Sequence, residues 1–219
     1  MAQGYRFAPG ISASRPADRL ILLDLRRDRY FALTDDLDAA VSRLIAGTAG
    51  NEDRARFEML AAEGVLLPAA TDERPSLCPT VQAARTTLAL PAGHTSRWRT
   101  MLATLSVIRA RHVLNRQGLE RAIADLRAWR PTAPVDSPTD LYRIVAAFRA
   151  ASGLISPLDQ CLPRSLALVR RLFAAGLAPD LVIGVAVQPF RAHCWVQSGD
   201  QLLIDDAGSV RQFTPILVL

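Results

Sequence analysis

Apolar positions in the first third of the chain predict a hairpin followed by two helices. Residues 20–24 and 29–33 are apolar runs on either side of a polar turn, a pattern typical of a β-hairpin. Apolar residues then recur at helical spacing over 34–46, after an expected N-cap at Thr34, and again over 52–63. A short strand is expected at 65–68. Residues 1–70 are therefore predicted to form a compact winged-helix-like module.

The rest of the chain predicts helices first and strands afterwards. Residues 71–93 are rich in proline and small polar residues and are predicted to be a linker. In 94–219, helical spacing covers 96–129, with Gly118 as a candidate break, then 137–151 and 161–175. Apolar runs follow at 181–187, 192–197, 201–205 and 210–218, and their short connections predict an antiparallel meander. This order predicts an α+β fold.

Composition narrows the class of protein. The chain has 219 residues, of which 50% are hydrophobic and 21% charged, as expected of a globular protein. The apolar runs are shorter than the roughly 18 residues of a membrane span, and the N-terminus lacks the pattern of a secretory signal. The cysteines are Cys78, Cys161 and Cys194, too sparse a set for a disulfide scaffold. We therefore expect a cytoplasmic protein that does not engage a membrane.

Charge is unevenly spread along the chain. The formal net charge is +5, and every basic residue is arginine, which excludes lysine-based chemistry. The arginine excess is concentrated in residues 75–130, whereas residues 1–74 have more acids than arginines. A basic stretch can bind nucleic acid or an acidic peptide, or it can simply be an exposed helix face. No helix-turn-helix or zinc-finger pattern is present, so no nucleic-acid partner is expected.

Cys161 is the strongest candidate nucleophile because of where its helix must begin. Pro163 lacks a backbone N–H and is tolerated only in a first turn, so this helix is predicted to start at Gln160 or Cys161. A thiol there lies at the positive end of the helix dipole, beside free backbone N–H groups. Both features favour the thiolate, and the same N–H groups suit an oxyanion. A buried structural cysteine is the alternative interpretation.

His193 and a following aspartate are the candidate partners of this thiol. If the next hairpin has a three-residue loop at 198–200, His193 and Asp205 are cross-strand neighbours within reach of a hydrogen bond. Trp195 would then share their face and shield the bond, and Cys194 would point away. A two-residue turn at 199–200 would pair His193 with Asp206 instead, and spacing leaves both registers open. The set suggests a thiolate, a base and an orienting carboxylate.

Other chemistry has little support in the sequence. A zinc site built from Cys161, His193, Cys194 and Asp205 is disfavoured, because His193 and Cys194 lie on opposite faces of one strand and no CxxC spacing occurs. There is no glycine-rich phosphate loop and no GxSxG motif. His94 and His112 are expected at the surface. No bound cofactor or metal is predicted.

These motifs together resemble a known family. The blocks 161–168 (CLPRSLAL), 190–196 (FRAHCWV) and 203–206 (LIDD) resemble the transglutaminase-like leader peptidases of lasso-peptide biosynthesis, the B proteins. Residues 1–70, with LLDLRRDRYFAL followed by TDDLDAAVSRLI, resemble the PqqD-like recognition module of the single-chain members. The resemblance implies a papain/transglutaminase-like cysteine protease domain over 94–219, with Cys161 as nucleophile, His193 as base and Asp205 as orienting carboxylate. The family spacing favours Asp205 over Asp206.

The resemblance also implies a bacterial peptide-processing function. The leader of a ribosomally made lasso precursor would bind the PqqD-like module, and the protease domain would cut it from the core. The freed core N-terminus would pass to an asparagine-synthetase-like macrolactam synthetase, the partner that uses ATP. We expect the leader to add a strand near Tyr30 and Phe31, against the helix bearing Arg54, Phe57 and Leu60.

Two other functions are compatible with the sequence. The same three residues serve a transglutaminase-like acyltransferase with an amine acceptor. A non-catalytic peptide-binding scaffold is the second alternative, and it predicts that Cys161 is dispensable.

Overall fold

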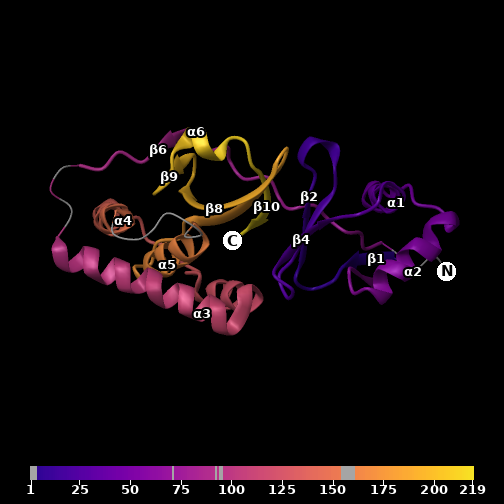
Figure 1. Ribbon diagram of the computed structural model, residues 1–219, viewed down its shortest axis with the longest axis horizontal. Helices are drawn as coiled ribbons and strands as arrows, with labels where there is room; N and C mark the ends of the chain where they lie inside the picture. Colours follow the sequence, from indigo (N-terminus) through magenta and orange to yellow (C-terminus); the bar gives the residue numbers. More distant parts are fainter. Residues whose placement is uncertain (1–3, 71, 92, 94–95, 154–160) are drawn as a thin grey trace. The chain divides into compact units, whose positions relative to one another are not determined.

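The chain divides into two compact units. The computed structural model describes residues 4–70, 72–91, 93, 96–153 and 161–219. One unit comprises Met1–Pro79 and the other Thr80–Leu219 (Figure 1). The division falls inside the stretch predicted as a linker, 71–93. That prediction is wrong for its second half, because residues 80–91 belong to the second unit and supply a strand to its sheet.

In its described residues, the first unit consists of two small sheets and two α-helices. Strands β3 (Ile21–Asp24) and β4 (Arg29–Ala32) form the predicted hairpin, and β2 (Ile11–Ser14) extends it into a sheet of order β2-β3-β4. Strand β1 (Gly4–Phe7) pairs with β5 (Leu66–Ala69). The helices are α1 (Asp35–Ala46) and α2 (Arg54–Ala62), with short 3-10 turns at Pro16–Asp18 and Asn51–Asp53. The winged-helix-like and PqqD-like description of this unit stays a prediction.

Local sequence accounts for the ends of α1. Thr34 occupies the N-cap position with an extended backbone, and three aspartates follow in the first turn, where the helix dipole favours acids. Gly47 ends the helix in the left-handed conformation, which glycine adopts without a steric cost. The inner face of α1 packs into one apolar core with the sheets and α2. The largest fully buried side chains of that core are Leu20, Leu22, Leu60 and Leu66.

The second unit is a five-stranded sheet with helices against one face. The helices are α3 (Arg97–Trp129), α4 (Pro138–Ser152) and α5 (Cys161–Ala174), and they lie on one side of the sheet in Figure 1. The strands are β6 (Thr86–Thr87), β7 (Asp180–Val187), β8 (Phe190–Ser198), β9 (Gln201–Leu202) and β10 (Thr214–Val218). A short helix, α6 (Ala207–Val210), precedes β10. The predicted α+β class is confirmed.

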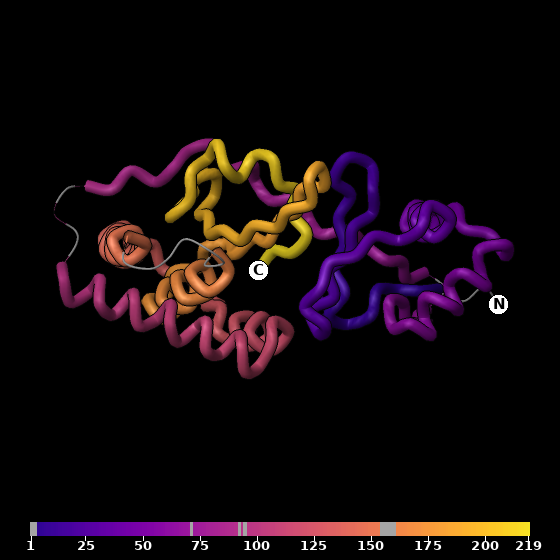
Figure 2. Tube along the Cα trace, in the orientation of Figure 1, coloured from indigo at the N-terminus to yellow at the C-terminus, as the bar shows by residue number. Residues whose placement is uncertain are grey.

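Gly118 divides α3 as the sequence suggests. Its backbone is non-helical, with φ 78° and ψ 173°, a conformation open mainly to glycine. The chain trace changes direction within this helix (Figure 2). Both halves of α3 contribute buried residues, among them Val107 before the break and Ile123 after it. The break lets one long segment follow two directions around α5, against which it packs.

The order of the strands differs from the predicted meander. The sheet has the order β10-β7-β8-β9-β6, so β10 pairs with β7 and not with its neighbour in sequence, β9. The pairing of β6 with β9 is parallel, and the others are antiparallel. The predicted strand over 210–218 is wrong for its first residues, because 207–210 form α6 and that helix carries the chain across to β7. The predicted strand over 201–205 ends at Leu202.

Candidate active site

Cys161 is the first residue of α5. Pro163 lies buried in the first turn, where its missing N–H costs the helix nothing, so the predicted start of the helix is confirmed. The Cys161 side chain is partly buried, and hydrogen bonds join it to the His193 imidazole and to backbone N–H groups of Leu162 and Cys194. A thiol with these donors around it is set up to carry negative charge.

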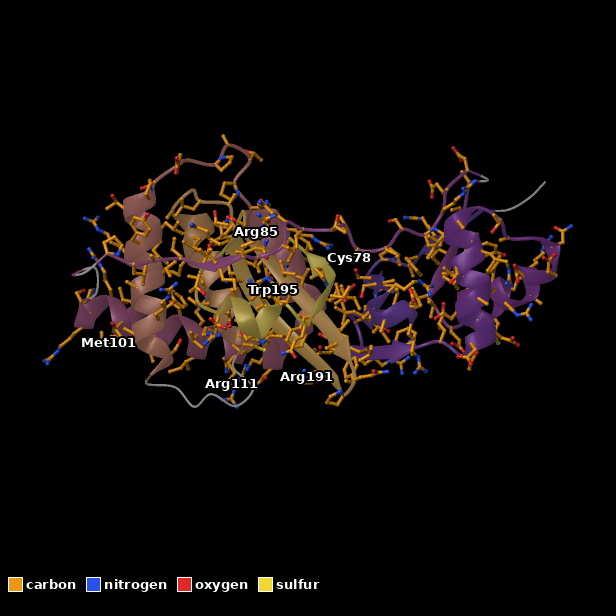
Figure 3. All side chains as sticks on the ribbon, turned by 90° about the horizontal axis from the view of Figure 1, so that it is seen from above. Cys78, Arg85, Met101, Arg111, Arg191 and Trp195 are labelled. Carbon is orange, nitrogen blue, oxygen red and sulfur yellow. The ribbon has the colours of Figure 1, made fainter. Side chains whose placement is uncertain are left out.

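His193 projects from β8 and meets Asp205 on one side. Its Nε2 lies 3.3 Å from Oδ1 of Asp205, which leaves Nδ1 as the ring nitrogen available to the thiol. The Trp195 ring stacks nearly parallel to the imidazole at 6.2 Å, and the Phe213 ring lies 5.5 Å away. Trp195, labelled in Figure 3, is a buried residue of β8. The imidazole therefore packs beside two aromatic rings that restrict its orientation.

The register that brings His193 to Asp205 is not the one expected. Gln197 pairs with Leu202 and Ser198 with Gln201, so the turn is the two-residue Gly199-Asp200. The three-residue loop, which the spacing of the resembling family favoured, is wrong. An unbroken strand in this register would bring Asp206 opposite His193. The strand ends at Leu202, however, and residues 203–205 bend, which carries the Asp205 carboxylate to the imidazole. The residue pair is as expected, but its geometric reason is different.

Three side chains hold the bend that carries Asp205. Nη2 of Arg164 donates to Oδ1 of Asp205 at 2.8 Å. Arg149 of α4 donates through Nε to the carbonyl of Leu203 at 2.9 Å, and the Thr87 hydroxyl donates to the carbonyl of Asp205 at 3.3 Å. Sequence reasoning missed Arg164, although it lies one helical turn after Cys161 and so on the same face of α5.

A glycine opposite His193 makes room for the tryptophan. Gly184 of β7 is the cross-strand partner of His193. A Cβ at Gly184 would lie 2.7 Å from the Trp195 ring and 2.9 Å from the Cβ of Phe213, both too close. The missing side chain thus lets both rings pack around the imidazole. Sequence analysis did not single out Gly184, although a glycine inside an apolar strand is a known signal of such a close approach.

Electrostatics favour a thiolate–imidazolium pair. Burial would raise the pKa of the Cys161 thiol, but hydrogen bonds from His193 and the backbone outweigh it and the pKa is lowered. Burial would lower the pKa of His193, but hydrogen bonds with Asp205 and Cys161 outweigh it and raise the pKa to about 9. Each shift favours the charged form of its group. Around neutral pH the pair is therefore expected to be ionised.

The other cysteines and histidines lie in different surroundings. Burial raises the pKa of the Cys78 thiol to about 11, and burial also raises that of Cys194, which lies in the core. The buried Ser165 hydroxyl donates a hydrogen bond to the backbone carbonyl of Cys194 at 3.0 Å. This bond joins α5 to β8. His112 is exposed on α3, and His94 is outside the described residues. Cys161 is thus the cysteine with a lowered pKa.

The residues expected to bind a leader are only partly accessible. Phe57 and Leu60 are 4% and 0% exposed in the core of the first unit, so their predicted contact with a peptide is wrong. They point inward because α2 packs its apolar face on the sheets. Arg54 is exposed and forms an ion pair with Glu58 at 2.9 Å. Tyr30 and Phe31 lie on β4, an edge strand of its sheet, and are half-buried.

The described ranges contain neither a metal-binding cluster nor a helix that could span a membrane. No group of three or more His, Cys, Asp or Glu side chains there is arranged to hold a metal ion. No helix in those ranges has both the length and the apolar character needed to cross a bilayer.

Comparison with known proteins identifies the family of the second unit. Residues 104–218 match the model of the transglutaminase-like superfamily, which is more than half of the chain and includes Cys161, Arg164, His193 and Asp205. The chain belongs to the transglutaminase-like superfamily. Over 53 residues it is also 47% identical to the microcin J25-processing protein McjB of Escherichia coli. These findings confirm the resemblance to a McjB-like processing protein, and they do not test the PqqD-like description of residues 1–70.

The similarity to McjB covers a limited part of both proteins. The matched stretch is 24% of the present chain and 25% of McjB, so the chain spans about a quarter of the length of McjB. No solved structure matches the chain. The family assignment therefore rests on the superfamily match, which coincides with most of the second unit.

Proposed function

We propose that this protein is a cysteine peptidase that removes the leader from a ribosomally made lasso-peptide precursor. The observation that carries the proposal is the contact chain from Cys161 through His193 to Asp205, with a lowered thiol pKa and a raised imidazole pKa. Membership of the transglutaminase-like superfamily and the similarity to a microcin-processing protein support it.

The proposed reaction begins at the carbonyl that joins leader and core. The Cys161 thiolate attacks this carbon, and backbone N–H groups near the start of α5 stabilise the resulting oxyanion. The His193 imidazolium then gives its proton to the departing core amine, and Asp205 keeps the ring oriented. The leader remains as a thioester on Cys161. Water, deprotonated by His193, hydrolyses the thioester and returns the thiolate.

The first unit is proposed to be the PqqD-like recognition module for the leader. Strand β4 is at an edge of the β2-β3-β4 sheet, which suits the addition of a peptide strand. Tyr30 and Phe31 on this strand are the proposed contacts. The released core would pass to an ATP-using macrolactam synthetase, and no cofactor is proposed for this chain itself.

The decisive experiment combines purified protein with a lasso-peptide precursor, and the products are analysed by mass spectrometry. Cleavage that disappears in Cys161→Ala but persists in the matched Cys78→Ala variant supports the proposal. In heavy-oxygen water, hydrolysis places the label in the new carboxylate of the leader. Transfer of the leader to an added amine without that label would identify an acyltransferase. Cleavage by Cys161→Ala at the wild-type rate would leave only the scaffold function.

A further inference from the structure

The first half of α3 carries an apolar stripe that the described residues of its own unit leave uncovered. Its residues follow one another at intervals of three, four and three, so they lie on one face of the helix. Unusually for large apolar residues, each is at least two-fifths exposed. We call these four residues the α3 seam. They are Trp98 (62% exposed), Met101 (42%), Leu105 (53%) and Ile108 (56%).

The seam is not the face by which α3 packs on its own unit. Ala103 and Val107, on the opposite side of the same helical turns, are 4% and 2% exposed. That inner face packs among α4 and α5. Because α3 is fixed by its buried side, the seam cannot rotate inward and stays available on the outside of the unit.

Arginines flank the seam on both sides. Residues 97–117 contain five arginines and no acidic residue. With 100° between successive residues, Arg97 and Arg111 fall on one flank of the seam, and Arg109 and Arg116 on the other. The seam is thus an apolar line between two rows of positive charge, and it lies in the most basic part of the chain. Met101 and Arg111 are labelled in Figure 3.

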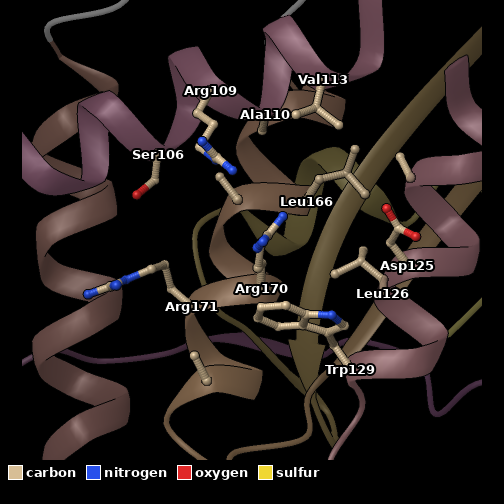
Figure 4. Close-up of a pocket in the computed structure, with 13 residues that line it drawn as sticks. Ser106, Arg109, Ala110, Val113, Asp125, Leu126, Trp129, Leu166, Arg170 and Arg171 are labelled. Atoms are coloured by element: carbon tan, nitrogen blue, oxygen red, sulfur yellow. The ribbon is translucent and has the colours of Figure 1, made fainter. Parts of the chain in front are cut away.

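A hollow next to the seam adds further guanidinium groups. A cavity of about 450 Å³ lies between α3 and α5, and Arg109 from the flank of the seam lines it. Arg170 and Arg171 of α5 line its other wall, and Arg170 lies over the Trp129 ring at 4.5 Å. Figure 4 shows Arg109 and Arg170 extending into this space from opposite helices. Carboxylates of a molecule bound along the seam would therefore lie near the flanking arginines and also near the arginines that line the cavity.

We propose that the α3 seam is the docking site for an acidic amphipathic helix of a partner protein. Leu, Ile, Met and Trp at intervals of three and four match the a and d positions of a two-helix contact. Flanking arginines match glutamates at the e and g positions of the incoming helix, which set the choice of partner. This surface lies outside the Cys161 site, and the proposal does not depend on the peptidase function.

Other occupants fit this surface less well. Two copies of the seam would bring arginine rows together without an acid to offset them, so self-association is disfavoured. A lipid surface calls for a broad apolar face, whereas this is a narrow line bordered by half-buried and polar positions such as Thr104. The narrow pattern between cations therefore favours a protein helix with carboxylates on either side of its own apolar line.

The first test measures binding of a designed probe to the full-length protein by fluorescence anisotropy. The probe is a peptide of about three heptads with Leu at a and d and Glu at e and g. We expect binding that weakens as salt is added, because exposed charge pairs are screened. A peptide of the same composition with scrambled Leu positions, and one with Lys in place of Glu, should bind at least tenfold more weakly. Equal binding of either control would overturn the proposal.

The second test changes the protein. Leu105→Glu should weaken binding of the probe at least tenfold, whereas Val135→Glu, at an equally exposed apolar position away from the seam, should not. Reversing Arg97 and Arg111 to Glu should weaken binding and reduce its dependence on salt. Unchanged binding in both seam variants would overturn the proposal. Two other results would also overturn it. One is a protein that does not bind the probe but binds anionic phosphatidylglycerol vesicles. The other is a protein that does not bind the probe but forms a dimer that Leu105→Glu abolishes.

Discussion

Nε2 of His193 lies 3.3 Å from Oδ1 of Asp205, although the strand register directs His193 toward residue 206. The contact exists because β9 ends at Leu202 and the chain bends over 203–205. Asp206, next along the chain, has a different structural role, because its Oδ2 accepts a hydrogen bond from the N–H of Gly208 at 2.8 Å and caps α6. Two adjacent aspartates thus divide between the site and the helix that follows it.

This division gives a prediction for the two aspartates. Asp205→Ala should lower kcat by roughly a hundredfold or more, because the imidazole loses the group that orients it. Asp206→Ala should leave kcat near the wild-type value and cost about 1 kcal/mol of stability at most, as expected for a lost N-cap. Cleavage assays and thermal unfolding of both variants measure these effects. A greater loss of activity in Asp206→Ala would show that the wrong carboxylate has been assigned.

The thiol should react as a thiolate at a pH where ordinary cysteines do not. The pKa of Cys161 is lowered, so its thiolate persists as pH falls below about 8.5, the usual value for cysteine. The pKa of His193 is raised to about 9, so the imidazolium persists as pH rises to that value. Activity that needs both charges should fall at each end of this window. Iodoacetamide at neutral pH should label Cys161 before Cys78 or Cys194, as read by peptide mass spectrometry.

His193 provides the control for this labelling. His193→Ala should slow the alkylation of Cys161 at neutral pH and abolish cleavage, because the thiol loses the imidazole that lowers its pKa. Labelling of Cys161 that is as slow as that of Cys78 in the wild-type protein would contradict the ion pair.

Arg164 should act as a positioning residue. Arg164→Met should lower kcat roughly ten- to a hundredfold with little change in KM, since small misplacements of catalytic groups cost about that much. Loss of the cation should also raise the pKa of the nearby imidazole and move the alkaline limb of the pH profile upward. Arg164→Lys should restore part of kcat. Arg171→Met, an exposed arginine on the same helix, is the control. An unchanged pH profile would assign Arg164 a purely structural role.

A proline in β4 tests the proposed recognition of the leader. The N–H of Leu25 donates to Gly10, on the β2 side, so alternation along β3 and β4 directs the N–H of Phe31 toward β3 and that of Tyr30 away from it. Tyr30→Pro should therefore raise KM for the precursor much more than it lowers kcat. Phe31→Pro should instead lower the thermal stability of the protein. Unchanged precursor affinity in a folded Tyr30→Pro variant would exclude β4 as the docking strand.

The elements of this fold that depend on local chemistry were predictable from sequence. The start of α5 follows from Pro163, which is tolerated only in a first turn, and this fixes Cys161 at the helix N-terminus. The break at Gly118 and the end of α1 at Gly47 follow from the left-handed conformations that glycine allows. Helical spacing likewise predicted α1 to α5, and apolar runs on either side of a polar turn predicted the hairpin of β3 and β4. In each case the deciding residues are neighbours in the chain.

Tertiary structure decided whatever depends on contacts between distant segments. The end of β9 at Leu202 has no local signal in the sequence. The bend that follows is held by Arg149 of α4 and Thr87 of β6, which are distant in the chain. The pairing of β10 with β7 joins two segments that are separated in the sequence by β8 and β9. Phe57 and Leu60 are apolar, as residues of a peptide-binding face often are. Packing of α2 on the sheets buries them in the core instead. The sequence indicates which side chains are stabilised by burial or by an opposite charge, whereas the fold determines which partners lie within contact distance of them.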